Sequence, residues 1–118
     1  MTKKDLQDLV NLKKELLMWE DYQRHLKRKT YHGEKTDKVA VSLAEAEKTI
    51  SNITEQIQKK IEECIKFIES VEQSDLRQAL FYKYVYGKNY VQIAIKLGTT
   101  EDAIRVKVRR YLEKNGIV

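Results

Sequence analysis

The sequence contains no proline, four glycines and a single cysteine among its 118 residues. Without proline, no position is barred from the interior of a helix. One cysteine excludes a disulfide bond within the chain, and the two histidines lack the ligand spacing of a zinc site. No apolar stretch approaches the roughly 18 residues of a membrane-spanning helix, and the opening Met-Thr-Lys-Lys-Asp does not resemble a signal peptide. We therefore expect a helical protein of the reducing cytoplasm, with no metal, cofactor or membrane.

Residues that could carry catalysis are also scarce. Cys64 falls on an apolar helix face, where a cysteine is expected to be a small buried hydrophobe and not a nucleophile. His25 and His32 have no carboxylate arranged to make either of them a base. The sequence has no glycine-rich phosphate loop and no paired-carboxylate motif. These absences argue against an enzyme.

Charged residues make up 35% of the chain, and the net charge of +5 is unevenly placed. Residues 1–72 hold 14 basic and 14 acidic residues, whereas residues 73–118 hold nine basic and four acidic ones. A basic C-terminal segment is typical of a module that binds nucleic acid. It is also compatible with lysines that only keep small helices in solution.

The N-terminal part of the chain has the spacing of two long amphipathic helices. The first is expected over residues 3–30, and the second from Ser42, with Glu45 completing a capping box. The segment 30–41 between them contains Gly33 and many polar residues, which predicts a loop. Two helices of similar length joined by a short loop favour an antiparallel hairpin.

Apolar residues repeat along both helices at heptad-like intervals. The two seams consist of Leu9, Leu12, Leu16, Trp19 and Leu26, and of Leu43, Ala46, Ile50, Ile53, Ile57, Ile61, Cys64, Ile68 and Val71. Leu17 and Tyr22 widen the first face beyond a single seam, so more than one neighbour is expected. Either the C-terminal helices or a second chain can supply that neighbour. Isoleucine-rich seams favour the second chain, and thus a homodimer through the hairpin.

The C-terminal third reads as three short helices over residues 74–87, 89–97 and 101–114. Gly87 and Gly98 follow the first two helices, where a left-handed residue commonly ends a helix. Residues suited to the N-cap stand at the three helix starts: Ser74, Asn89, and Thr99 or Thr100. Two short helices joined by a tight glycine turn form a helix-turn-helix pattern.

Apolar periodicity assigns a core face to the last two helices. In the second helix the inward positions are expected to be Val91 or Tyr90 together with Ala94 and Ile95, with Ile93 and Leu97 flanking them. In the third helix a core stripe is expected at Ile104, Val108, Tyr111 and Leu112. Asp102, Arg105 and Arg109 then share the opposite, solvent side.

The C-terminal third resembles region 4 of sigma-70-type factors over about 40 residues. The resemblance lies in Leu80, Tyr84, Gly87, Ile93, Ala94, Leu97, Gly98, Thr100, Ile104, Arg105 and Leu112. It is strongest to the small sigma-like regulators of phages and integrated elements, the ArpU-type group. Membership would imply transcription regulation, duplex DNA as partner and contact with RNA polymerase. Glu101 stands where sigma factors usually have a basic residue, so base preference is not carried over.

Together the pattern and the resemblance predict an all-α protein: a coiled-coil-like hairpin over residues 1–72, followed by a helix-turn-helix DNA-binding domain over residues 73–118. Helix 101–114 is expected to read the major groove, and the candidate DNA-binding residues are Lys88, Lys96, Thr99, Thr100, Glu101, Asp102, Arg105, Arg109 and Arg110. Arg105 can give bidentate hydrogen bonds to guanine, and Asp102 can accept from cytosine. Alternatively, Asp102 and Arg105 pair only with each other as a solvated ion pair.

Two functions of different classes fit these features. The first is a sequence-specific transcription regulator encoded by a phage or mobile element. The second is a phage assembly protein such as a small terminase subunit, which also combines a helix-turn-helix with oligomerising helices. In that family the DNA-binding part usually precedes the oligomerising helices, the reverse of the order here. The sigma-like residues also favour the regulator.

Overall fold

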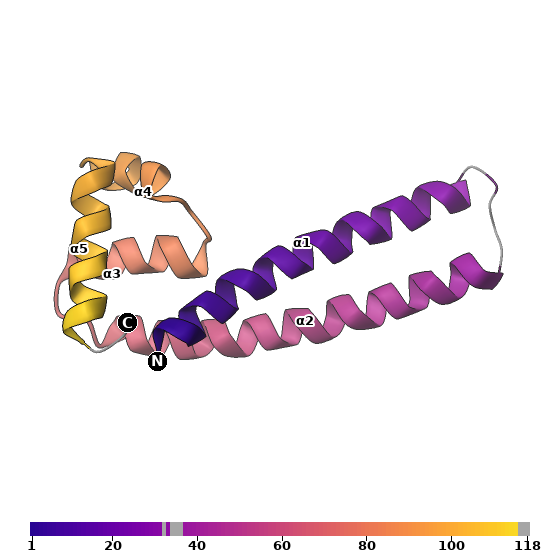
Figure 1. Cartoon of the computed structure of the whole chain (residues 1–118), viewed down its shortest axis with the longest axis horizontal. Helices are drawn as coiled ribbons and strands as arrows, with labels where there is room; N and C mark the ends of the chain where they lie inside the picture. The colour runs from indigo at the N-terminus through magenta and orange to yellow at the C-terminus, as the bar shows by residue number, and fades with distance from the viewer. Residues whose placement is uncertain (32, 34–36, 116–118) are drawn as a thin grey trace. The chain divides into compact units, whose positions relative to one another are not determined.

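The computed structural model describes residues 1–31, 33 and 37–115, and its regular elements there are all helical (Figure 1). The elements in chain order are α1 (Lys3–Tyr31), α2 (Asp37–Glu69), α3 (Ser74–Leu80), the π-helical turn η1 (Phe81–Val85), α4 (Tyr90–Leu97) and α5 (Glu101–Lys114). The predicted all-α class is confirmed. None of the described helices is long and apolar enough to cross a membrane.

The chain forms two compact units, which we describe separately. The hairpin unit consists of residues 11–58, and the terminal unit consists of residues 1–10 and 59–118. The division of the sequence into domains at residue 72 stays a prediction.

The hairpin unit pairs the distal part of α1 with the first part of α2, and the two helices run antiparallel (Figure 1). Its buried residues are Leu26, Ala46, Ile53 and Ile57, all of them on the predicted seams. The remaining seam positions of this unit are half-buried, and none is exposed. The apolar spacing therefore identified the contact faces of both helices correctly.

The loop predicted over residues 30–41 is too long. Helix α1 continues to Tyr31 and α2 already begins at Asp37, whereas His32 and residues 34–36 lie outside the described residues. Asp37 stands in the first turn of α2, where an acidic side chain complements the helix dipole. Ser42 therefore lies inside the helix, and the capping box predicted for Ser42 and Glu45 is wrong.

The terminal unit packs α3, η1, α4 and α5 around one apolar centre, together with the first part of α1 and the last part of α2. Its buried residues are Leu6, Leu9, Cys64, Ile68, Val71, Leu76, Ala79, Leu80, Tyr84, Ile93, Ala94, Ile104 and Val108. Leu76, Leu80 and Tyr84 follow one another at intervals of four residues, and all three are buried. Cys64 is fully buried, as its apolar position predicted.

The start of α3 differs from the prediction. Its N-cap is Gln73, whose side chain makes no capping hydrogen bond, so the cap assigned to Ser74 is wrong. Ser74 is the first helical residue, and its hydroxyl accepts a hydrogen bond from Gln78 Nε2 at 3.3 Å. Asp75 does lie in the first turn, where its Oδ1 accepts from the Leu76 backbone N–H at 2.9 Å. The helix is thus stabilised from within its first turn.

The end of the helix predicted over residues 74–87 is a π-helical turn. The Tyr86 N–H donates to the Phe81 carbonyl at 3.2 Å, which is the i→i+5 bond of a π-turn. Tyr86 is exposed, and its ring contacts that of Phe81 edge-on with the centroids 5.2 Å apart. Gly87 follows with φ of 69°, the left-handed conformation that its position predicted.

Side chains connect the elements of the terminal unit to one another. Arg77 Nη1 donates to the backbone carbonyls of Val71 at 2.7 Å and Glu72 at 3.0 Å. A side chain of α3 therefore supplies hydrogen bonds to two carbonyls of the segment that follows α2. Lys107 of α5 forms an ion pair with Asp75 of α3. The ion pair joins α5 to α3 at the surface, and the buried Ile104 and Val108 pack α5 into the core of the unit.

Candidate nucleic-acid interface

A capped turn of three residues joins α4 to α5. The Asn89 side chain accepts from Gln92 N at 2.8 Å and Gln92 Oε1 accepts from Asn89 N at 3.0 Å, which is a complete capping box for α4. Gly98 ends α4 with φ of 65°. Thr100 Oγ1 then accepts from Ala103 N at 3.2 Å and caps α5. The predicted caps at Asn89, Gly98 and Thr100 are confirmed, and they hold the two helices at a defined turn.

The predicted core face of α4 is wrong by one register position. Ile93 is fully buried, whereas Val91 is 50% exposed and Ile95 76% exposed. Ala94 is buried as predicted, and Tyr90 and Leu97 are half-buried. Gln92 and Lys96 mark the polar side of α4, and Ile93 and Ile95 lie equally far from it in opposite directions, so the spacing does not decide between them. Packing against α3 and α5 selects the face centred on Ile93.

Helix α5 presents the faces that its spacing predicted. Ile104 and Val108 are buried, with Tyr111 and Leu112 half-buried beside them. The exposed residues of its solvent side include Asp102, Arg105, Arg109 and Arg110. In the described part of the chain, the guanidinium groups of Arg109 and Arg110 make no hydrogen bond or ion pair, so both are available to an outside ligand.

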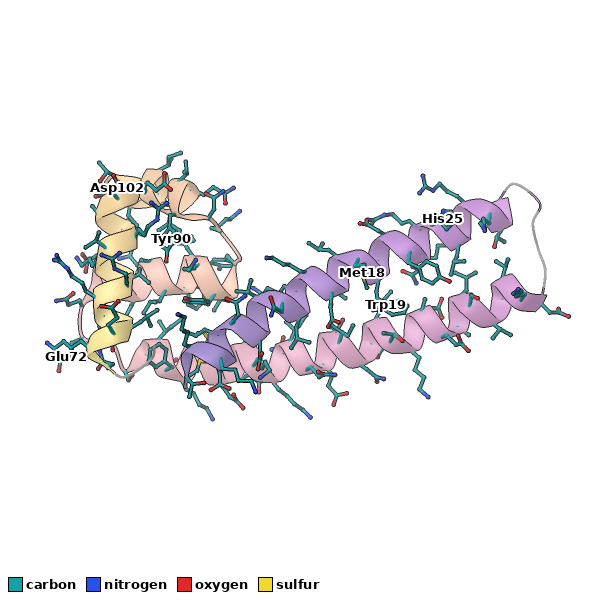
Figure 2. All side chains as sticks on the ribbon, viewed as in Figure 1. Met18, Trp19, His25, Glu72, Tyr90 and Asp102 are labelled. Atoms are coloured by element: carbon teal, nitrogen blue, oxygen red, sulfur yellow. The ribbon has the colours of Figure 1, made fainter. Side chains whose placement is uncertain are left out.

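Arg105 is more constrained than the other two arginines. Its guanidinium forms an ion pair with Glu101 and lies 3.5 Å from Asp102 Oδ1. The same group lies over the ring of Tyr90, with Arg105 Cζ 5.5 Å from the ring centroid. Figure 2 labels Tyr90 and Asp102 at this end of α5. The pairing of Arg105 with Asp102 that the sequence allowed is therefore present, and Glu101 is the closer partner.

A second cation contacts the same tyrosine ring. Lys83 Nζ lies 4.1 Å from the centroid of Tyr90 and 5.5 Å from that of Tyr84. Burial lowers the pKa of Lys83, and the nearby Arg105 lowers it further. Burial raises the pKa of Tyr90, although Arg105 opposes that rise. Tyr90 thus links η1 to α5 through two cation–π contacts. Sequence reasoning missed Lys83, because its distance from Tyr90 depends on the π-turn.

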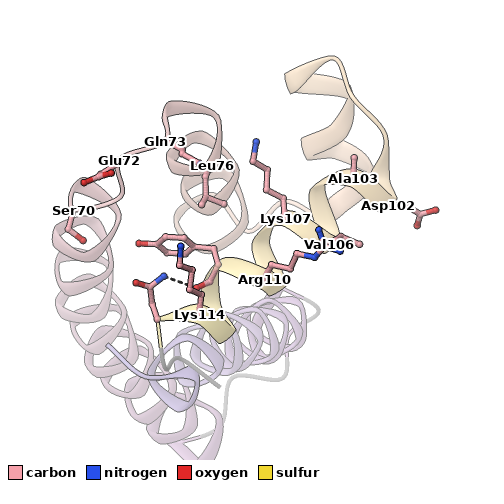
Figure 3. A pocket seen from close by; sticks show the side chains of 12 residues that line it. Ser70, Glu72, Gln73, Leu76, Asp102, Ala103, Val106, Lys107, Arg110 and Lys114 are labelled. Atoms are coloured by element: carbon pink, nitrogen blue, oxygen red, sulfur yellow. Dashed lines mark hydrogen bonds between the residues drawn. The ribbon is translucent and has the colours of Figure 1, made fainter.

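Two hollows flank α5 within the terminal unit. The smaller has a volume of about 330 Å³ and is lined by Lys3, Leu6, Gln7, Tyr84, Tyr90, Arg105, Arg109, Leu112 and Glu113. The larger has a volume of about 870 Å³ and lies between α5 and the chain around Gln73 (Figure 3). Its basic residues are Lys107, Arg110 and Lys114, which stand at i, i+3 and i+7 on one side of α5. This spacing was readable in the sequence, yet Lys107 and Lys114 were not predicted as site residues.

The remaining predicted residues surround the turn and are exposed or half-exposed. Lys88 precedes α4, Lys96 lies in its last turn, and Thr99 and Thr100 form the turn itself. Among the described residues, the ammonium groups of these two lysines make no hydrogen bond or ion pair. The structure therefore brings Glu101, Asp102 and Arg105 into direct contact and leaves the two lysines apart from them.

Comparison with known proteins does not assign a family. No family model, no curated protein and no solved structure matches this chain. The described residues also contain no group of histidine, cysteine or acidic side chains that could hold a metal ion. The functional argument therefore rests on the chain's own residues.

Proposed function

We propose that the terminal unit is a helix-turn-helix module that binds duplex DNA and regulates transcription. The observation that carries this proposal is α5 itself: it buries Ile104 and Val108 and exposes Arg105, Arg109 and Arg110. The capped turn after α4 holds this helix at a fixed angle to its neighbour. A helix that presents arginines opposite its core stripe fits the major groove in width and charge.

Contacts to the DNA backbone would come from both sides of α5. Arg109 and Arg110 are exposed, and Lys88 and Lys96 lie on or beside α4. The Thr100 hydroxyl accepts the capping bond of α5, so its own proton remains free to donate to a phosphate. Each neutralised phosphate contributes about 0.9 to the slope of log affinity against log salt.

Arg105 is the residue to which we assign base recognition. Its ion pairs with Glu101 and Asp102 are solvated, and such pairs are worth at most about 1 kcal/mol. A bidentate contact with guanine can therefore replace them. Asp102 would then become free to accept from a cytosine amino group.

The resemblance to sigma region 4 supports two wider proposals. The protein would act in the cytoplasm, where phage or mobile-element promoters are transcribed, and RNA polymerase would be a second partner. Neither depends on the identity of the bases that α5 reads.

Selection from a library of random duplexes, using the full chain, tests the proposal. Wild type should enrich one sequence, and Arg105→Ala should weaken binding to it by about 1–3 kcal/mol and relax one base pair. Lys96→Ala is the matched control, because loss of a phosphate contact should weaken all sequences alike. No enrichment by wild type, together with an affinity that does not change between roughly 50 and 200 mM salt, would overturn the proposal.

A further inference from the structure

Helix α1 carries an apolar patch on the surface of the hairpin unit. Leu17 is 62% exposed, Met18 56% and Tyr22 41%. Met18 is labelled in Figure 2. Single exposed apolar residues are common on protein surfaces, but these three lie within six consecutive residues of one helix and share adjoining faces. The neighbouring seam residues Leu16 and Trp19 are half-buried, so the exposed patch adjoins the apolar seam between the two helices.

The charges beside the patch suit a second copy of the same chain. Lys14 and Asp21 are both exposed and lie on the face of Leu17, three residues before it and four residues after it. If two α1 helices pair antiparallel about an axis between Leu17 and Met18, Leu17 of one copy meets Met18 of the other. The same register sets Lys14 of each copy opposite Asp21 of the other, on both sides of the apolar centre.

A two-fold dimer needs this kind of self-complementarity, because one surface patch must fit itself. A parallel pairing in register would instead set Lys14 against Lys14 and Asp21 against Asp21. The ion pair of Asp21 with Arg24 does not prevent the contact, since both groups are exposed and such a pair is weak. Asp21 can accept from both cations.

We infer that the chain forms an antiparallel two-fold dimer through α1, with Leu17 and Met18 at the centre of the interface. Tyr22 flanks that centre, and two pairs of Lys14 with Asp21 border it. Three apolar side chains per copy form a smaller interface core than permanent dimers possess, so the dimer dissociates on dilution. This inference does not depend on DNA binding, because every residue involved lies in the hairpin unit.

Sedimentation equilibrium over a concentration series tests the surface. Wild type should pass from monomer to dimer, and Leu17→Glu with Met18→Glu should remain monomeric. The matched control is Val91→Glu with Ile95→Glu, which places the same charges on the exposed apolar face of α4 and should dimerise as wild type does. Circular dichroism should show unchanged helix content in both, because all four side chains are exposed. A dimer that survives the α1 change, or a wild type that is monomeric at its highest soluble concentration, would overturn the inference.

Charge reversal tests the antiparallel register. Lys14→Asp and Asp21→Lys should each weaken self-association, since each sets like charges opposite one another. An equimolar mixture of these two variants should dimerise again, because every pair across the heterodimer is then of opposite sign. A mixture no better associated than its components would refute the register. A ring of more than two copies would refute the two-fold dimer and favour an assembly protein.

Discussion

The two compact units differ in how they bury apolar side chains. Of the buried apolar residues in the described chain, 13 lie in the terminal unit and four in the hairpin unit, so the hairpin depends on one thin seam. Two helices can cover only one stripe of each other, which leaves Leu17 and Met18 in solvent. The terminal unit closes its core on several sides.

The difference in packing is matched by a difference in charge. The hairpin unit carries nine basic and eight acidic residues, whereas the terminal unit carries 14 basic and ten acidic ones. The net charge is therefore +1 on the hairpin unit and +4 on the terminal unit, although charged residues make up a similar share of both. The comparison teaches that the terminal unit carries most of the basic excess, whereas both units expose apolar side chains: Leu17 and Met18 in one, Val91 and Ile95 in the other.

The largest expected effect comes from disrupting the core of the terminal unit. Ile93→Asp would bury an unpaired charge and should unfold this unit, with a loss of more than about 3 kcal/mol. Ile95→Asp, two positions along the same helix, should change stability by less than about 0.5 kcal/mol, because Ile95 is exposed. Chemical denaturation measures both. If Ile95→Asp lost as much stability as Ile93→Asp, Ile95 would lie in the core, as the spacing of α4 predicts.

The turn before α5 offers a smaller and more local test. Gly98→Ala should cost about 1–2 kcal/mol, because alanine is strained at a φ of 65°. A Cβ atom at Gly98 would meet no other atom within 4 Å, so the cost is purely conformational. Gly98→Asn should cost less, since asparagine tolerates the left-handed conformation. If both variants lost equal stability, steric contact and not backbone strain would be the cause.

Substitutions at Tyr90 test whether its two cation–π contacts stabilise the terminal unit. Tyr90→Leu should reduce the stability of the terminal unit by about 1 kcal/mol or more, because it removes the cation–π contacts of both Lys83 and Arg105. Tyr90→Phe keeps the ring and removes only the hydroxyl, so it should resemble wild type. Thermal unfolding distinguishes the two variants. Identical behaviour of phenylalanine and leucine at this position would argue that the ring serves as apolar filling alone.

The smallest effect concerns the ion pair between Asp75 and Lys107. Hydrogen bonding to Lys107 lowers the pKa of Asp75 below its ordinary value of 3.8. A lowered carboxyl pKa adds stability above the ordinary value, and this stability is lost as the pH falls through the lowered one. The stability difference between wild type and Asp75→Asn should therefore vanish in acid.

The hairpin unit supplies the control for that measurement. Asp21→Asn removes an exposed pair within one helix and, compared at a concentration at which the chain is monomeric, should cost less stability at neutral pH than Asp75→Asn. A pH-dependent loss as large as that of Asp75→Asn would contradict the view that pairs between helices matter more here.

Local chemistry made much of this structure predictable. Helix α5 was predicted with its observed bounds, and Asn89, Gly98 and Thr100 act as the caps that their residue types favour. Caps and amphipathic stripes depend on atoms within a few residues, so the sequence contains the information. The same holds for the seams of α1 and α2, in which no predicted position is exposed. DNA binding, the regulator function and the site residues remain predictions for experiment.

The sequence by itself determined the helical class, the positions of most helices and the face of α5, because each follows from spacing and short-range hydrogen bonds. Only the tertiary structure decided between Ile93 and Ile95 as the buried side of α4, since both lie equally far from the polar residues Gln92 and Lys96 and the packing of α3 and α5 selects Ile93. The π-turn and the approach of Lys83 and Arg105 to one tyrosine ring were likewise decided there. These contacts join residues of different elements, whose distances no local pattern encodes.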